Sequence, residues 1–223
     1  MAGDGGARDE MIAVAERLFA ERGIEAVSLR EIGAAAGQRN NSAAQYHFGS
    51  RDGLVDAIFE ARMAPIDRRR RAMVAEIEAA GATTDLRAVC EAFVVPLAEP
   101  DTETVPSWYA RFLAQVVFDP GFDLLAKRRL PVTTGLRRSI ALLNDCLGHV
   151  PSTLRAERLV LAGTLVVHGL ANRERAREEA GAARATPLSV FVADLVDAMV
   201  GVLAAPASPQ TKRALRASTR RSA

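Results

Sequence analysis

The start of this chain is divided into short segments by glycines that end helices and serines that begin them. This spacing of helix ends limits the possible folds more than any other property of the sequence. Apolar residues at helical spacing predict an amphipathic helix over residues 8–22, which ends at Gly23. Ser28 and Glu31 form an S-x-x-E capping box that begins a second helix, and this helix ends at Gly37. The chain is therefore expected to open with closely spaced short helices.

A polar turn separates the second helix from the third. Residues 38–41 are polar and turn-like, and Ser42 with Gln45 can form a second capping box, opening a short helix that ends near Gly49. Ser50 then caps a fourth helix. Three short helices, the second and third joined by a tight polar turn, are typical of a helix-turn-helix unit.

Longer helices are predicted for the rest of the chain. Pro65 predicts the end of the fourth helix (50–63), because proline is tolerated in the first turn of a helix but not in its interior. Further helices are expected at 66–80, 85–98, 105–118, 131–147, 152–179 and 187–204.

The two ends of the chain have a different composition. Residues 1–7 are rich in glycine and alanine, and residues 205–223 hold two prolines, small residues and five basic side chains. Both ends are predicted to be disordered, the second as a basic tail. No segment alternates like a strand, so the predicted fold class is all-α: a three-helix head (8–50), a helical body (51–204) and the tail.

Composition excludes several classes of protein. The net charge of +2 means that any nucleic-acid binding must come from a local patch, since the chain is no bulk polycation. Cys90 and Cys146 lie in apolar segments and are interpreted as small hydrophobes without a disulfide, which fits a reducing cytoplasm. Without an apolar signal segment or an apolar run of membrane-spanning length, a cytoplasmic protein with no membrane partner is expected.

The residue identities of the first sixty positions are more specific than the helix boundaries alone. The segments "AERLFAERGIEAVSLREIGAAAG" and "QYHFGSRDGLVDAIF" closely resemble the DNA-binding head of the TetR family of repressors over about residues 9–59. The remainder is similar to the family only in length and helical character. One departure stands out: between Gly37 and Phe48 the chain holds one residue more than the family pattern, so Gln45 falls where a tyrosine usually lies. Which side chains of the third helix face the bases is therefore open.

The resemblance implies a regulator of transcription. A homodimer would bind a palindromic operator in double-stranded DNA, and a small, largely apolar effector in the body would release it. No cofactor or metal is implied, and no catalysis.

Physical chemistry supports a DNA site at the polar turn and third helix. Short polar side chains at the start of a helix can read base edges in the major groove, and no acid lies between Arg39 and Arg51. Helix starts also offer free N–H groups to phosphates. Tyr46 is interpreted as a phosphate contact and Phe48 as core, whereas His47 either touches a phosphate or caps its helix. The predicted DNA-binding residues are Ser28, Arg30, Gln38, Arg39, Asn40, Asn41, Ser42, Gln45, Tyr46, His47 and Arg51.

The body holds candidates for an effector pocket and for a dimer interface. Aromatic and polar residues of the middle helices are the candidate pocket walls: Phe93, Trp108, Phe112, Gln115, His168 and Asn172. The alternative for each is an ordinary core position. The last two long helices carry the candidate dimer residues Leu159, Gly163, Val167, Phe191, Leu195 and Met199, because the apolar stripe on 187–204 is too wide for a single neighbour. Burial inside the monomer is the alternative.

An enzyme is the weaker hypothesis. The three histidines have no metal-ligand spacing, and no P-loop, Rossmann or G-x-S-x-G pattern occurs. The Arg68–Arg71 run is interpreted as a solvated helix face. Two alternatives stay open: a helical small-molecule-binding protein or enzyme without a DNA function, and a head that contacts only protein.

Overall fold

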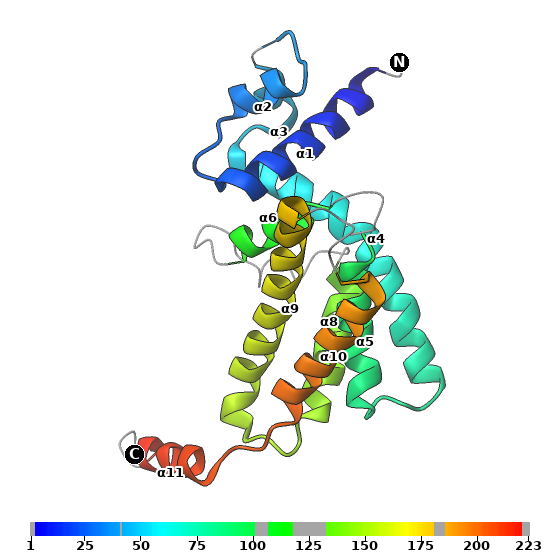
Figure 1. Cartoon of the computed structure of the whole chain (residues 1–223), viewed down its shortest axis with the longest axis vertical. Coiled ribbons are helices and arrows are strands. Elements are labelled where there is room, and N and C mark those ends of the chain that lie inside the picture. Colours follow the sequence, from blue (N-terminus) through cyan, green and yellow to red (C-terminus); the bar gives the residue numbers. More distant parts are fainter. Residues whose placement is uncertain (1–2, 41, 101–106, 118–132, 181–185, 220–223) are drawn as a thin grey trace.

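The computed structural model describes residues 3–40, 42–100, 107–117, 133–180 and 186–219, and within these ranges every regular element is a helix. The prediction of an all-α fold is confirmed. Figure 1 shows α1, α2 and α3 as a small head at one end of the molecule. The longer helices form an elongated body, and the two termini lie at opposite ends.

The head consists of α1 (Gly3–Arg22), α2 (Leu29–Ala35) and α3 (Ala43–Phe48). The hydroxyl of Ser28 accepts a hydrogen bond from the Glu31 N–H at 3.2 Å, as the first capping box predicts. Gly37 ends α2 with a left-handed φ of 68°, a backbone conformation that glycine adopts without strain. This turn directs the chain toward α3.

The second predicted capping box is wrong. Ser42 precedes α3 but makes no side-chain cap, since its ψ of 6° departs from the extended backbone that a serine cap needs. Its own N–H donates instead to Oδ1 of Asn40 at 2.9 Å, and the amide of Gln45 donates to the carbonyl of Gly49. The polar side chains of the turn thus bond to nearby backbone.

Helix α4 (Arg51–Ala79) runs without a break from the head into the body, so the predicted end at Pro65 is wrong. Proline lacks the N–H that would bond to the carbonyl of Ala61. The turns on both sides are nevertheless held by buried side chains, including Phe59, Met63 and Ile66. Packing here outweighs the loss of one backbone hydrogen bond.

The body consists of α4 and five further helices of the described chain. They are α5 (Leu86–Ala98), α6 (Tyr109–Val116), α8 (Thr134–Cys146), α9 (Ser152–Ala180) and α10 (Leu188–Ala204). These agree with the predicted ranges except at their ends; parts of 105–118 and 131–147 fall outside the described residues. Helix α4 packs against α5 and α8, and α9 packs against α6 and α10. Helix α1 also packs on α6, where Phe19 and Phe112 stack with ring centroids 6.4 Å apart. Head and body therefore share one core.

The described parts of both ends of the chain are helical, which corrects the prediction of disorder. Helix α1 already begins at Gly3, and α11 (Pro209–Thr219) occupies most of the predicted tail. The hydroxyl of Ser208 accepts from the Thr211 N–H at 3.1 Å and caps α11, whose Ala, Gln, Arg and Lys residues favour helix. No single helix of the described chain is long and apolar enough to cross a membrane. The consecutive helices α10 and α11, which are bent by 53° relative to each other, would together be long and apolar enough by length and composition alone.

Candidate nucleic-acid interface and junction cavity

Helix α3 and the turn before it present polar side chains to solvent. Tyr46 is 81% exposed, and Gln45 and Ser42 are exposed beside it. The opposite side of α3 is buried, with Ala44 and Phe48 in the core of the head, as predicted for Phe48. The short helix is thus anchored by apolar side chains, and its polar side chains face outward, where the major groove of DNA could contact them.

The other predicted DNA-binding residues lie around this helix. Ser28 and Arg30 are exposed at the start of α2, and Arg39 and Asn40 are exposed in the turn. Gln38 is half-buried and donates to the carbonyl of Ala36 at 3.1 Å. Asn41 lies outside the described residues.

His47 is also half-buried. Its ring lies between its neighbours, with centroids 5.3 Å from Tyr46 and 6.1 Å from Phe48.

Arginines of the head differ in whether they already have an acidic partner. Nη1 of Arg51 lies 2.6 Å from a carboxylate oxygen of Glu25, and Arg22 pairs with Glu31. Among the described residues no ion pair is found for Arg30 or Arg39. A phosphate would therefore have to displace Glu25 from Arg51, whereas the other two guanidinium groups are available for it.

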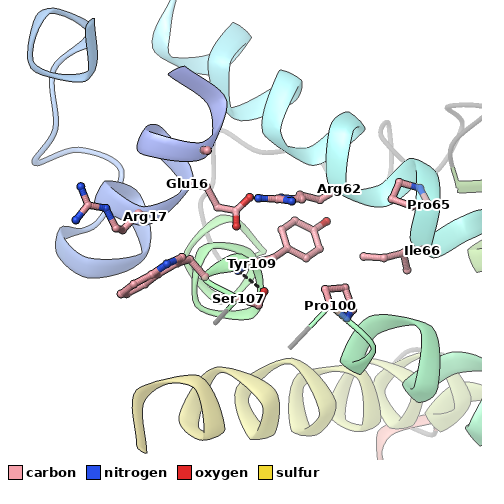
Figure 2. Close-up of a pocket in the computed structure, with 10 residues that line it drawn as sticks. Glu16, Arg17, Arg62, Pro65, Ile66, Pro100, Ser107 and Tyr109 are labelled. Atoms are coloured by element: carbon pink, nitrogen blue, oxygen red, sulfur yellow. Dashed lines mark hydrogen bonds and ion pairs between the residues drawn. The ribbon is translucent and has the colours of Figure 1, made fainter. Parts of the chain in front are cut away.

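A cavity of about 330 Å³ lies where the head meets the body. Figure 2 shows α1, α4 and the start of α6 around it. Its lining residues are Ala13, Glu16, Arg17, Arg62, Pro65, Ile66, Pro100, Ser107, Trp108 and Tyr109.

A buried carboxylate forms part of this wall. Glu16 is 2% exposed and accepts from Nε of Arg62 at 2.5 Å. Burial raises the pKa of Glu16 above its ordinary value, while the hydrogen bond and charge of Arg62 and the backbone N–H of Trp108 act in the opposite direction.

A buried phenol forms another part of the wall. Tyr109 is 2% exposed, and its hydroxyl has no hydrogen-bond partner among the described residues. Burial raises the pKa of this phenol, so it stays protonated and is a hydrogen-bond donor.

Only one of the six predicted pocket residues, Trp108, lines this cavity. Phe112 is fully buried between Phe19 and Tyr109, and Phe93 lies under the guanidinium of Arg70. The three polar candidates are exposed on the chain's own surface: Gln115, His168 and Asn172. The structure does not bring the predicted set together.

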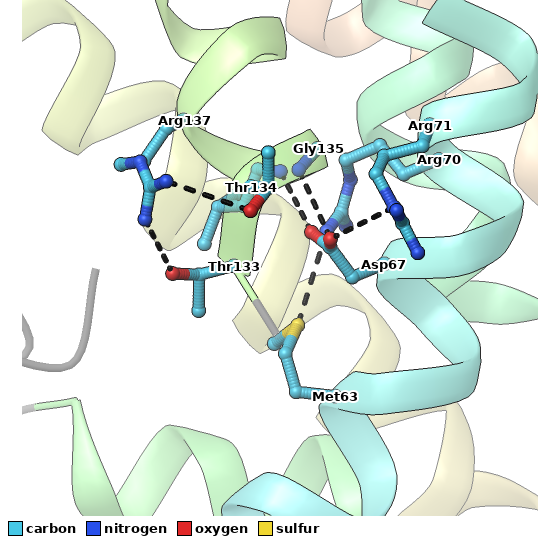
Figure 3. Close-up of polar contacts among 9 residues, drawn as sticks. Met63, Asp67, Arg70, Arg71, Thr133, Thr134, Gly135 and Arg137 are labelled. Carbon is cyan, nitrogen blue, oxygen red and sulfur yellow. Dashed lines mark hydrogen bonds and ion pairs between the residues drawn. The ribbon is translucent and has the colours of Figure 1, made fainter. Parts of the chain in front are cut away.

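The body also contains a buried charged cluster that the sequence did not reveal (Figure 3). Asp67 is 1% exposed and accepts from the N–H groups of Gly135 at 3.0 Å and Leu136 at 2.9 Å, which caps the start of α8. Arg71 lies 3.6 Å from the same carboxylate. Glu174 of α9 plays the same part at α6, accepting from the N–H groups of Ala110 and Arg111.

Arg70 corrects the interpretation of the arginine run as a solvated face. It is 1% exposed, donates to the carbonyl of Phe93 at 3.1 Å, and its pKa is lowered to about 10 by burial. The apolar stripe of α4 passes through Met63, Arg70 and Val74, so helical spacing was the signal that could have placed Arg70 inside.

The predicted dimer residues are divided between the surface and the interior of the chain. Leu159, Gly163 and Phe191 are partly exposed. Val167, Leu195 and Met199 are buried, as α9 packs on α10. Apolar side chains of the same two helices that stay exposed are Val160 at 66%, Leu161 at 61% and Val190 at 55%.

The described part of the chain holds neither a metal-ligand cluster nor a disulfide. No group of three or more His, Cys, Asp or Glu side chains that could hold a metal ion is found there. Cys90 and Cys146 are both free thiols, and burial raises the pKa of Cys90 to about 12. A thiol of this kind is inert at neutral pH.

Comparison with known proteins supports the assignment of the head. The family model for bacterial regulatory proteins of the tetR family matches residues 11–58. HTH-type transcriptional repressor KstR2 of Rhodococcus jostii (strain RHA1) is 38% identical over 92 residues, which span 41% of this chain and 42% of that repressor. A crystal structure of a TetR-family regulator from Streptomyces coelicolor A3 aligns over 92% of this chain and 98% of the other, with 18% identity and a TM-score of 0.37.

Proposed function

We propose that this chain is a DNA-binding transcriptional regulator, acting as a repressor and not as an enzyme. The proposal starts from the match of residues 11–58 to the family model for bacterial regulatory proteins of the tetR family. The observation that carries the proposal is α3, which is anchored by buried Ala44 and Phe48 and presents Ser42, Gln45 and Tyr46 to solvent. A helix of this kind enters the major groove and reads base edges with its exposed side chains.

Contacts to the phosphate backbone would position α3. The start of α2 presents N–H groups near Ser28, and Arg30 and Arg39 add positive charge on the same small head. Tyr46 can donate its hydroxyl to a phosphate because it is almost fully exposed. Arg51 contributes once its ion pair with Glu25 is exchanged for a phosphate.

The regulator acts as a homodimer on a palindromic operator. Val160 and Leu161 on α9 and Val190 on α10 are large exposed apolar side chains that a second copy would cover. His168 and Asn172 are exposed on α9 at four-residue steps from Thr164, so they extend this same face. Two heads on one dimer read half-sites about one helical turn apart.

An effector in the body would release the repressor from DNA. Helix α4 is continuous from the capped start at Ser50 into the core of the body, so a shift of the body moves the head. The effector works only through its difference in affinity for the two head spacings, and operator DNA must weaken effector binding by the same factor.

Fluorescence anisotropy with labelled DNA from the chain's own promoter region tests the DNA function. A salt-sensitive affinity that exceeds the affinity for unrelated DNA is expected. Arg39→Ala should weaken binding about equally on every sequence and flatten the salt dependence, as loss of a phosphate contact does. Gln45→Ala should instead relax the preference at one base pair, by about 1–3 kcal/mol.

Two results would count against this assignment. Equal affinity for all DNA would leave the protein-contact or small-molecule alternatives. If Arg39→Ala and Gln45→Ala behave alike, α3 does not read the bases. Leu161→Glu offers a separate check on assembly, since it should yield monomers in light scattering without disturbing a buried contact.

A further inference from the structure

In the cavity between head and body, the described wall has more unengaged hydrogen-bond donors than unengaged side-chain acceptors. Glu16, the one carboxylate among the described lining residues, already accepts from Nε of Arg62, and the backbone N–H of Trp108 also bonds to it. The hydroxyl of Ser107 accepts from the Tyr109 N–H at 3.1 Å. The two side-chain acceptors Glu16 and Ser107 therefore already receive hydrogen bonds from the protein itself.

Several hydrogen-bond donors of the same wall have no acceptor among the described residues. Tyr109 has a buried hydroxyl without a partner among the described residues, and in Figure 2 this phenol points from α6 toward α4. Arg62 uses Nε for Glu16, which leaves its two terminal nitrogens. Arg17 is exposed at the rim, and no ion pair with a described residue is found for it. The described lining residues include two arginines and one carboxylate, so this part of the wall carries a net positive charge.

Apolar groups make up the rest of the lining. Pro65 and Ile66 of α4, Pro100 and the indole of Trp108 enclose the remaining space. The volume of about 330 Å³ is roughly twice that of an apolar cavity of ~150 Å³ that holds one benzene molecule. An occupant on the order of ten non-hydrogen atoms fits this volume.

We propose that this junction cavity is a binding site for a small amphipathic carboxylate. The apolar part of the ligand packs against Pro65, Ile66 and Trp108. The carboxylate accepts a hydrogen bond from Tyr109 and takes charge stabilisation from Arg62, while Arg17, whose side chain points away from Tyr109 in Figure 2, adds positive charge at the rim. Because the Tyr109 hydroxyl has no partner among the described residues, the ligand gains this hydrogen bond without breaking another.

The location gives such binding a mechanical consequence, which rests on the proposed DNA function. Pro65 interrupts the backbone hydrogen bonding of α4 at the cavity, and α1 forms the opposite wall. A ligand that touches both helices favours one angle between head and body. Binding itself requires no DNA, so it is measured on the protein alone.

The test uses sodium octanoate as the probe and octanamide as its neutral counterpart. Trp108 is the only tryptophan of the chain and lies in the cavity wall, so its fluorescence reports on this site. Titration of the full chain with octanoate should shift the emission in a saturable way. Octanamide should bind at least about fivefold more weakly, since the wall favours an anion.

Variants locate the site. Tyr109→Phe removes only an unpartnered hydroxyl, so the protein should fold normally and bind octanoate about two- to tenfold more weakly. Arg17→Gln should weaken octanoate and leave octanamide unchanged. Tyr46→Phe, at the only other tyrosine, is the matched control and should bind like the unmodified chain.

Several outcomes would overturn the proposal. These are no saturable shift with octanoate, equal affinity for octanoate and octanamide, or unchanged octanoate binding in both Tyr109→Phe and Arg17→Gln. Failure of DNA binding in the separate anisotropy experiment would leave the cavity site standing, and the reverse also holds.

Discussion

The head and two helices of the body, α6 and α8, provide hydrogen-bond acceptors for their first N–H groups in different ways. In the head, Ser28 and Ser50 each accept from an N–H group three residues further along the chain. In the body, the start of α8 is capped by Asp67, which is 68 residues away from Gly135, and the start of α6 by Glu174, which is 64 residues away from Ala110. The same need for a hydrogen-bond acceptor is thus met locally at α2 and α4 and across the fold at α8 and α6, although Asp85 also caps α5 of the body locally.

The difference follows from burial. The serine caps lie at the surface, where water can satisfy an N–H group that loses its cap. Asp67 and Glu174 are 1% and 5% exposed, so water does not replace them. A buried carboxylate is stabilised only by several strong partners, and each of these two accepts from two backbone N–H groups and lies close to an arginine. The buried caps Asp67 and Glu174 should therefore contribute more to stability than the serine caps of the head.

Removal of the Asp67 cap is expected to give the largest effect. Asp67→Ala leaves two N–H groups of α8 unpaired and Arg70 buried without a nearby counter-charge, which should lower the free energy of unfolding by about 3–5 kcal/mol. Urea unfolding at one fixed protein concentration measures this. Glu60→Ala, at an exposed acid of the same helix, should change stability by less than about 0.5 kcal/mol. Similar values for the two variants would refute the distinction between buried and local caps.

An intermediate effect is expected for the glycine that ends α2. Gly37 has a φ of 68°, and an alanine there should lower stability by about 1–2 kcal/mol. Gly33 of the same helix has ordinary backbone and open space where a Cβ would lie, so Gly33→Ala should raise stability by up to about 1 kcal/mol. Thermal unfolding of the two variants compares them directly, and effects of the same sign would show that backbone conformation does not decide the outcome.

The smallest effect is expected for a local cap. Ser28→Ala removes the bond to the Glu31 N–H and should cost about 1 kcal/mol in urea unfolding. Ser42→Ala is the matched control, because Ser42 stands before α3 without capping it, and stability should be nearly unchanged. If Ser42→Ala is as destabilising as Ser28→Ala, then α3 is capped in solution as the sequence pattern suggested.

Sequence alone determined the head, because its signals act over a few residues. Ser28, Gly37 and Ser50 begin and end helices through bonds to their own segment, and the same letters carry the resemblance to a known family. The all-helical body could be predicted from apolar spacing for the same reason. The local rules failed where packing competes with them, as at Pro65 inside α4 and at Ser42 before α3.

Tertiary structure decided which side chains meet. Glu16 and Arg62 are 46 residues apart, yet they pair in the wall of the junction cavity. No sequence pattern around either residue predicts this pairing. Asp67 and Glu174 became caps only because α8 and α6 end up beside them. His168 and Asn172 have the spacing of a pocket wall but lie on the outer face of α9. Helical spacing defines a face of a helix, whereas packing against the other helices determines whether that face meets the core, a cavity or solvent.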